Sequence, residues 1–421
     1  MGGCEPAGNR LAAMTTQRPS GVPMQQVPPL HGGGPPRPLE VDPSVAVKGN
    51  VDANAVLRIG YVPAFDGLRG VGAVLVVAVH LFMVVIPANR ELPKTIPGTF
   101  VFMDMFFVLS GFLITALLLR EQTDRGRISL FAFYRRRAMR LLPALYTLLA
   151  VHWLYASIVG FDPHVEHVSL LLAAFYSLNW QMKTVFSPVA DGLTQLWSLS
   201  MEEQFYLVWP LLVIAFFNMR RRLTVVVLSL VVAISVVAIR RAFLWEGVNW
   251  LRLYTHTDTR ADSLLVGALL AFLWVHGKLP RRGLVPAAWS SLVFLTLCVL
   301  FARLDRPFAY LGGFTLMAVA WAVVILAAME SDWAGNRLLR FGPIMLLGEV
   351  SYAIYLWHVP VQVAVARHGQ TWSVVDRVVV SLVVTTIFVW LSWVLVEKPC
   401  LRWKDHIERR HLGVTRRATT P

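Results

Sequence analysis

The chain has 421 residues, of which 56% are hydrophobic and only 15% are charged, and its mean hydropathy is +0.57. This composition excludes an ordinary soluble protein, and apolar runs of about 20 residues from residue 71 onward predict membrane-spanning helices. The net charge of +14 could indicate a nucleic-acid partner, but the basic residues form short clusters between the apolar runs. Retention of Lys and Arg on the cytoplasmic side explains that pattern, so we expect no nucleic acid.

The first 57 residues differ in composition from the rest. They are rich in Pro and Gly and lack the apolar core of a cleavable signal peptide, so we expect a disordered cytoplasmic tail. Cys4, Cys298 and Cys400 lie far apart, which favours neither a disulfide framework nor a metal site. We therefore expect a tail over residues 1–57, a transmembrane domain over residues 58–399 and a basic cytoplasmic tail over residues 400–421.

Positive charge predicts the orientation of the spans. Residues 120–140 include seven arginines and are expected in the cytoplasm, which, with two spans before them, places the N-terminus there too. The apolar stretch Ser169–Asn179 is too short to cross, and a re-entrant or interfacial helix there keeps the later basic clusters inside. We predict an all-α, polytopic membrane helix bundle of about ten spans with both termini cytoplasmic, over residues 68–86, 100–119, 141–159, 196–217, 223–243, 261–275, 285–302, 311–329, 344–361 and 374–396.

Ionisable residues within apolar spans are costly and usually mark a functional site. The first span carries Asp66, Arg69 and His80. Arg69 and His80 lie about 16 Å apart along a helix and on nearly one face. An imidazole deep in the membrane could act as a general base, although a structural histidine bonded between helices is the alternative.

The next two spans add a serine and an arginine pair. Ser110 could carry an acyl group as a nucleophile, but it lacks the local motif of one, so helix packing is favoured. Arg137 and Arg140 share a helix face at i, i+3, where two guanidinium groups suit the phosphates of a nucleotide-bearing donor. Anchoring on the cytoplasmic side is an equally good explanation from spacing alone.

Three later motifs place polar residues near helix ends expected on the outer side. Glu202 and Glu203 begin one span and could orient a histidine or bind substrate hydroxyls. Asp262 lies at another helix start. Tyr355 and His358 share a helix face, where a substrate contact and an interfacial position are equally compatible with the pattern.

Together these motifs resemble the membrane acyltransferase-3 family, the OafA/OatA-type O-acyltransferases. The resemblance covers about residues 61–399. It implies transfer of an acyl group, commonly acetyl, from cytoplasmic acyl-CoA to a carbohydrate hydroxyl, with His80 as catalytic base, Arg69 in support, and Arg137 and Arg140 as donor-binding residues. It rests on FDGLRG with Arg69 and His80, FFVLSGFLI, the Arg137 and Arg140 pair, WSLSMEEQFYL, RADSLLVG, SYAIYLWH and VEKP.

The expected partners follow from that resemblance. They are membrane lipid and a glycan, glycolipid or glycosylated small molecule at a bacterial plasma membrane. Because only about twenty residues follow Pro399, we expect no fused extracytoplasmic domain, so the chain would act alone or with a separate extracytoplasmic acyltransferase. A transporter or flippase of a lipid-linked glycan is the alternative, although two related halves are not apparent.

Overall fold

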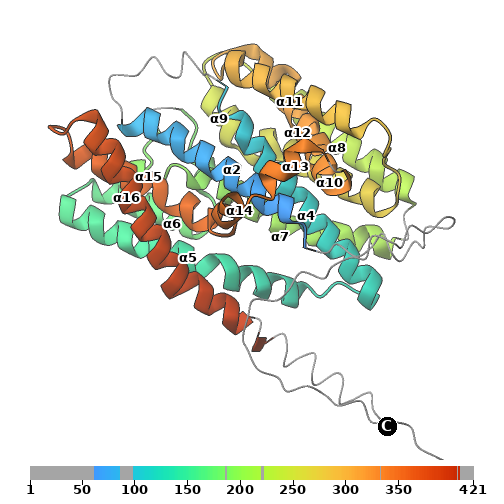
Figure 1. Cartoon of the computed structure of the whole chain (residues 1–421), viewed down its shortest axis with the longest axis horizontal. Coiled ribbons are helices and arrows are strands. Elements are labelled where there is room, and N and C mark those ends of the chain that lie inside the picture. Colours follow the sequence, from blue (N-terminus) through green and yellow to red (C-terminus); the bar gives the residue numbers. More distant parts are fainter. Residues whose placement is uncertain are drawn as a thin grey trace, which may run out of the picture. The chain divides into compact units, whose positions relative to one another are not determined.

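The computed structural model describes residues 61–85, 98–184, 187–219, 222–331, 333–404 and 406–407. The predicted N-terminal tail and most of the C-terminal tail lie outside these ranges. The described part is helical without a strand, which confirms the all-α bundle (Figure 1). Its helices are α2 (Pro63–His80), α4 (Val101–Arg125), α5 (Leu130–Val159), α6 (Pro163–Ala174), α7 (Leu196–Asn218), α8 (Leu223–Phe243), α9 (Trp250–Thr255), α10 (Thr257–Val275), α11 (Leu284–Phe301), α12 (Phe314–Glu330), α13 (Ala334–Leu339), α14 (Gly342–Glu349), α15 (Ser351–His368) and α16 (Val374–Ser392).

Short helical segments join or extend several of these helices. A π-helical segment, η1 (Leu81–Val85), follows directly on His80, so this histidine stands where the regular helix gives way. Such π segments are rare and are often found at functional sites. The other segments are η3 (Leu178–Trp180), η4 (Asp191–Leu193), η5 (Ala309–Gly313) and η6 (Trp393–Glu397).

Eight helices in the described ranges are long and apolar enough to cross a membrane, and nine if α14 and α15, which meet at a 71° bend, form one broken span. The predicted number of about ten is therefore not confirmed. The predicted span that is missing from the count of nine is α10, which carries Asp258, Arg260 and Asp262. The helix α6 has 12 residues and is too short to cross a membrane. It covers the first part of the stretch Ser169–Asn179, for which a non-crossing helix is predicted.

The charges of α10 are paired inside the bundle. Arg260 donates to the Oδ1 of Asp104 on α4 at 2.8 Å, and Arg241 on α8 donates to the Oδ2 of Asp262 at 2.9 Å. All four side chains are fully buried. A buried charge is tolerated when it is paired, so α10 can lie among α4, α8 and α12 in spite of its charged residues.

Glycines in the sequence motifs permit the closest helix contacts. A Cβ on Gly111 of α4 would lie 2.0 Å from the carbonyl oxygen of Leu264 on α10, and one on Gly267 would lie 2.1 Å from that of Val108. Only glycine allows backbones to approach this closely in a membrane bundle. These contacts hold α4 against α10, while α11 and α12 lie toward one side of the bundle and α5 and α16 toward the other (Figure 1).

Candidate active site

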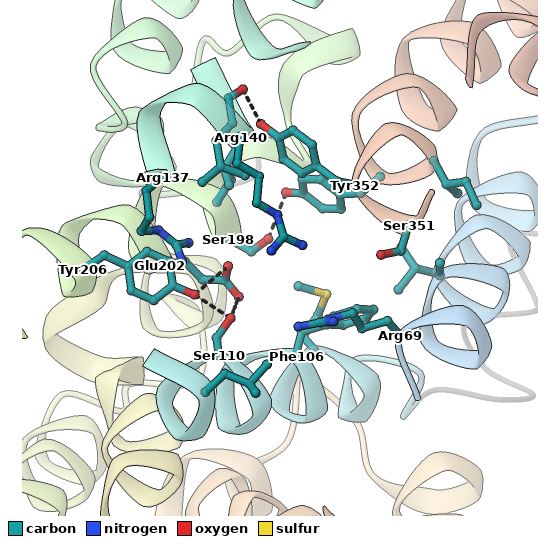
Figure 2. A pocket seen from close by; sticks show the side chains of 18 of the residues that line it. Arg69, Phe106, Ser110, Arg137, Arg140, Ser198, Glu202, Tyr206, Ser351 and Tyr352 are labelled. Carbon is teal, nitrogen blue, oxygen red and sulfur yellow. Dashed lines mark hydrogen bonds between the residues drawn. The ribbon is translucent and has the colours of Figure 1, made fainter. Parts of the chain in front are cut away.

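A cavity of about 340 Å³ lies between α2, α4, α5, α7 and α15 (Figure 2). Its walls are mostly apolar, with polar side chains converging from all five helices, as is typical of a ligand site. The polar residues that line it are Arg69, Ser110, Arg137, Arg140, Ser198, Glu202, Tyr206, Ser351, Tyr352, Tyr355 and His358.

The arginines of the cavity differ in how they are held. Arg137 donates to the Oε1 of Glu203 at 3.1 Å, and its guanidinium lies 3.5 Å above the ring of Tyr206. Arg69 donates to the Oδ1 of Asp66 at 3.1 Å through one nitrogen. Arg140 is exposed to the cavity and has no ion pair among the described residues. Figure 2 shows Arg69 and Arg140 reaching into the cavity from different helices. These two therefore present free donors to an anion.

Glu202 is held by hydroxyl groups. Ser110 donates to its Oε1 at 3.1 Å, and Tyr206 donates to the Oγ of Ser110 at 2.6 Å. The chain of hydrogen bonds joins α4 to α7 on one wall of the cavity (Figure 2). Ser110 thus does more than pack between helices, which was the interpretation favoured by its sequence context.

Two histidines meet at the C-terminal end of α2. The rings of His80 and His358 form an edge-to-face pair with centroids 5.0 Å apart. The Nδ1 of His80 lies 2.9 Å from the carbonyl oxygen of Val76, and that of His358 lies 3.0 Å from that of Ile354. A carbonyl can only accept, so each neutral ring carries its proton on Nδ1 and a lone pair on Nε2. In each ring, Nε2 can therefore accept a proton.

His358 is the histidine that lines the cavity. It is fully buried, and its Nε2 has no hydrogen-bond partner among the described residues. An unpaired buried acceptor is costly unless a ligand satisfies it. The described hydrogen bonds of Glu202 and Glu203 are with Ser110, Tyr206 and Arg137, and that of His80 is with its own helix. A role of either glutamate in orienting His80 therefore stays a prediction, with no direct hydrogen bond between them among the described residues.

The residues singled out in the sequence fall into three groups. Three lie directly behind the cavity wall, where Asp66 holds Arg69, Glu203 holds Arg137 and His80 packs on His358. Asp262 lies elsewhere, buried against Arg241 and Thr315. The remaining six line the cavity itself, namely Arg69, Arg137, Arg140, Glu202, Tyr355 and His358.

Sequence reasoning missed several lining hydroxyls. Ser198 hydrogen-bonds the hydroxyl of Tyr355 at 2.9 Å, and that hydroxyl also donates to the carbonyl of Gln195. Ser198 and Tyr206 lie one turn before and one turn after Glu202, so the helix spacing of WSLSMEEQFYL could have placed both on its face. In the described residues, no cluster of His, Cys, Asp and Glu is suited to a metal ion.

Comparison with known proteins bears on this site. A family described as an acyltransferase domain matches residues 62–397. The chain is 32% identical to the peptidoglycan O-acetyltransferase OatA of Listeria monocytogenes over 80% of its own length and 56% of that protein. It is 34% identical to YrhL of Bacillus subtilis, a protein provisionally given the same activity, over 80% and 55% of the two chains. No solved structure is significantly similar.

The chain spans a little more than half the length of these relatives. The matched family covers the helices that form the cavity, from α2 to η6. The transporter alternative gains no support from relatives named for acetyl transfer.

Proposed function

The chain belongs to the acyltransferase domain family, and on this premise we propose that it moves an acyl group from acyl-CoA to a hydroxyl of a carbohydrate-containing acceptor. The observation that supports this most is the cavity in which free guanidinium groups meet His358, with the ring of His80 packed directly behind it. The first suits the phosphates of a nucleotide donor, and the second suits removal of a hydroxyl proton.

Arg69 and Arg140 are the proposed donor ligands. Each has nitrogens free to donate to phosphate oxygens, whereas Arg137 is already held by Glu203 and Tyr206. The long apolar part of the cavity wall, from α2 and α4, suits the pantetheine arm and acyl chain. The arginine-rich start of α5 is expected in the cytoplasm, where CoA is found.

The proposed chemistry is a direct transfer. His80 takes the proton of the acceptor hydroxyl on Nε2, and the hydroxyl oxygen attacks the thioester carbonyl carbon. The C–S bond then breaks, an ester forms, and the thiolate recovers the proton from the imidazolium to leave as the CoA thiol. His358 supplies the neighbouring contact with the acceptor, because its ring meets the cavity.

The acceptor is proposed from the relatives. Because OatA and YrhL are named for acetylation of peptidoglycan, we propose a cell-envelope glycan as acceptor and acetyl as the acyl group. The chain would then act in the bacterial plasma membrane, with its arginine-lined end in the cytoplasm.

The test is acyl transfer by the full chain in lipid vesicles. Radiolabelled acetyl-CoA is the donor and a peptidoglycan disaccharide is the acceptor. His80→Ala should lower the rate by about 10²- to 10⁴-fold, the usual contribution of a general base. His276→Ala is the matched control, because its Nδ1 also contacts a carbonyl one turn earlier but it lines neither cavity described here.

The two histidine variants separate the roles. His358→Ala should raise the KM for the acceptor more than it lowers kcat. Full activity of a His80→Ala protein that inserts normally would overturn the mechanism. The reverse pattern, with kcat lost only in His358→Ala, would move the base to His358.

A further inference from the structure

A second cavity, of about 180 Å³, lies further along two of the helices that form the first. On α5, Arg140 lines the first cavity and His152 the second, about 18 Å further along the helix at ~1.5 Å per residue. On α15, His358 lines the first and Val363 the second. The two cavities thus share a pair of helices, and α6 and η4 close the second one.

The order along both helices is the same because they run parallel. The hydroxyl of Tyr352, near the start of α15, donates to the carbonyl of Leu141, which lies in the first half of α5, at 3.0 Å. Near their ends, the hydroxyl of Tyr155 lies 3.1 Å from the Nε2 of His368. With the start of α5 on the cytoplasmic side, the second cavity lies toward the outer side of the membrane.

The most buried polar side chains that line this cavity are a histidine–glutamate pair. The Nε2 of His152 lies 2.8 Å from the Oε2 of Glu166, and the two residues are 5% and 8% exposed. A carboxylate can only accept, so Nε2 carries the proton and the neutral ring has a lone pair on Nδ1. No hydrogen bond to that Nδ1 is found in the described part of the chain. The pair therefore offers an oriented acceptor to a ligand hydroxyl.

The absence of a side chain at Gly192 lets the ring of His152 lie directly against the backbone of η4. A Cβ at this position would lie 2.8 Å from the Cε1 and 3.1 Å from the Nδ1 of His152. The neighbouring Asp191 is exposed and lines the cavity. The rings of Tyr155 and Phe161, which also line it, pack with centroids 5.8 Å apart. Aromatic faces beside carboxylate and imidazole acceptors suit a ring that carries apolar C–H faces and many hydroxyls.

We infer that this second cavity binds a sugar ring of the acceptor, with His152 and Glu166 holding a hydroxyl. The inference rests on the proposed function, because it supplies the outer subsite that a two-sided transfer requires. Acceptor and donor would enter along the same helix pair from opposite ends. Neither His152 nor Glu166 takes part in the proposed proton transfer.

The test measures binding without turnover. Val165→Cys, which lines the cavity without removing a polar side chain, is labelled by a maleimide in lipid nanodiscs, in the full chain with Cys4→Ser and Cys400→Ser. The probe is the N-acetylglucosaminyl-N-acetylmuramic acid disaccharide, and we expect it to slow labelling about tenfold. Glu166→Gln and the cavity-filling Val363→Phe should abolish that protection. Val375→Phe, on the exposed face of α16, is the matched control and should leave protection unchanged.

Two further measurements separate the possible outcomes. Adding His80→Ala should leave protection intact, so that a failed transfer mechanism and a failed acceptor site give different results. Glu166→Gln in the transfer assay should raise the acceptor KM at least tenfold while the KM for acetyl-CoA stays within twofold. Labelling that the disaccharide does not slow, or a Glu166→Gln effect on the donor KM alone, would overturn the inference.

Discussion

Arg137 and Arg140 lie on one face of α5 and yet have different surroundings. The guanidinium of Arg137 is fixed between the carboxylate of Glu203 and the face of Tyr206. That of Arg140 has no ion pair in the described residues and projects into the cavity (Figure 2). Replacing Arg140 should therefore affect donor binding, whereas replacing Arg137 should affect the stability of the protein.

Arg140→Ala should raise the KM for acyl-CoA at least tenfold, because it removes a charge-assisted contact to the donor. Arg137→Ala should instead lower the stability by about 2 kcal/mol, since it breaks an ion pair and a cation–π contact. Donor KM and thermal unfolding in detergent measure the two effects. Arg140→Lys should be intermediate, because lysine keeps the charge without the planar fork. An unchanged melting temperature for Arg137→Ala together with a raised donor KM would reverse the assignment.

The sequence predicted the residue types of this site better than their contacts. Arg69, Arg137, Arg140 and His358 meet in one cavity because each stands on the inward face of its own helix. The link from Ser110 to Glu202 joins two helices with no local signal to connect them. Such pairings depend on how the helices pack, which helix periodicity alone does not determine.

Among the elements, α2 and α14 make the contact that holds Arg69 in place. A Cβ on Gly348 would lie 1.9 Å from the carbonyl oxygen of Asp66, and one on Gly70 would lie 2.1 Å from that of Ile344. Asp66 in turn binds Arg69. The glycines of FDGLRG and of GEVSYAIYLWH therefore belong to one helix contact, and through Asp66 that contact reaches the cavity.

Gly348→Ala should separate the two helices and destabilise the protein by about 1–3 kcal/mol, because backbone atoms cannot move aside as a side chain can. The donor KM should rise with it, since Asp66 would shift away from Arg69. Gly342→Ala, in the same short helix, is the control, because a Cβ there meets nothing within 4 Å. Thermal unfolding and donor KM are measured for both variants, and equal melting temperatures would contradict this account of the contact.

At the scale of the whole molecule, the sequence predicted where apolar spans lie but not where each helix begins. The third predicted span began at residue 141, whereas α5 begins at Leu130 and includes the arginines. Its start is set by Ser129, whose side chain accepts from the backbone of Ala132, and its end by Gly160, with a φ of 77°. Hydropathy detects the membrane core, while these caps determine the helix.

The orientation of the chain depends on whether α10 crosses the membrane. Ten crossings place both termini on one side, as the charge pattern predicts, and nine place them on opposite sides. α10 has 19 residues, which is about 28 Å of helix, close to the thickness of the hydrocarbon core. Its buried ion pairs remove the main objection to a crossing, namely the cost of its charges.

Single cysteines on either side of α10 decide the question. Glu246→Cys precedes the helix and Lys278→Cys follows it, and both native residues are exposed. The background carries Cys4→Ser and Cys400→Ser and keeps the buried Cys298. If α10 crosses, a membrane-impermeant maleimide should label Glu246→Cys in intact cells and Lys278→Cys only after permeabilisation. Equal labelling of both in intact cells would mean that α10 does not cross. That result would contradict the parallel course of α5 and α15, because α7, α8, α11 and α12 alone would then make these two helices antiparallel.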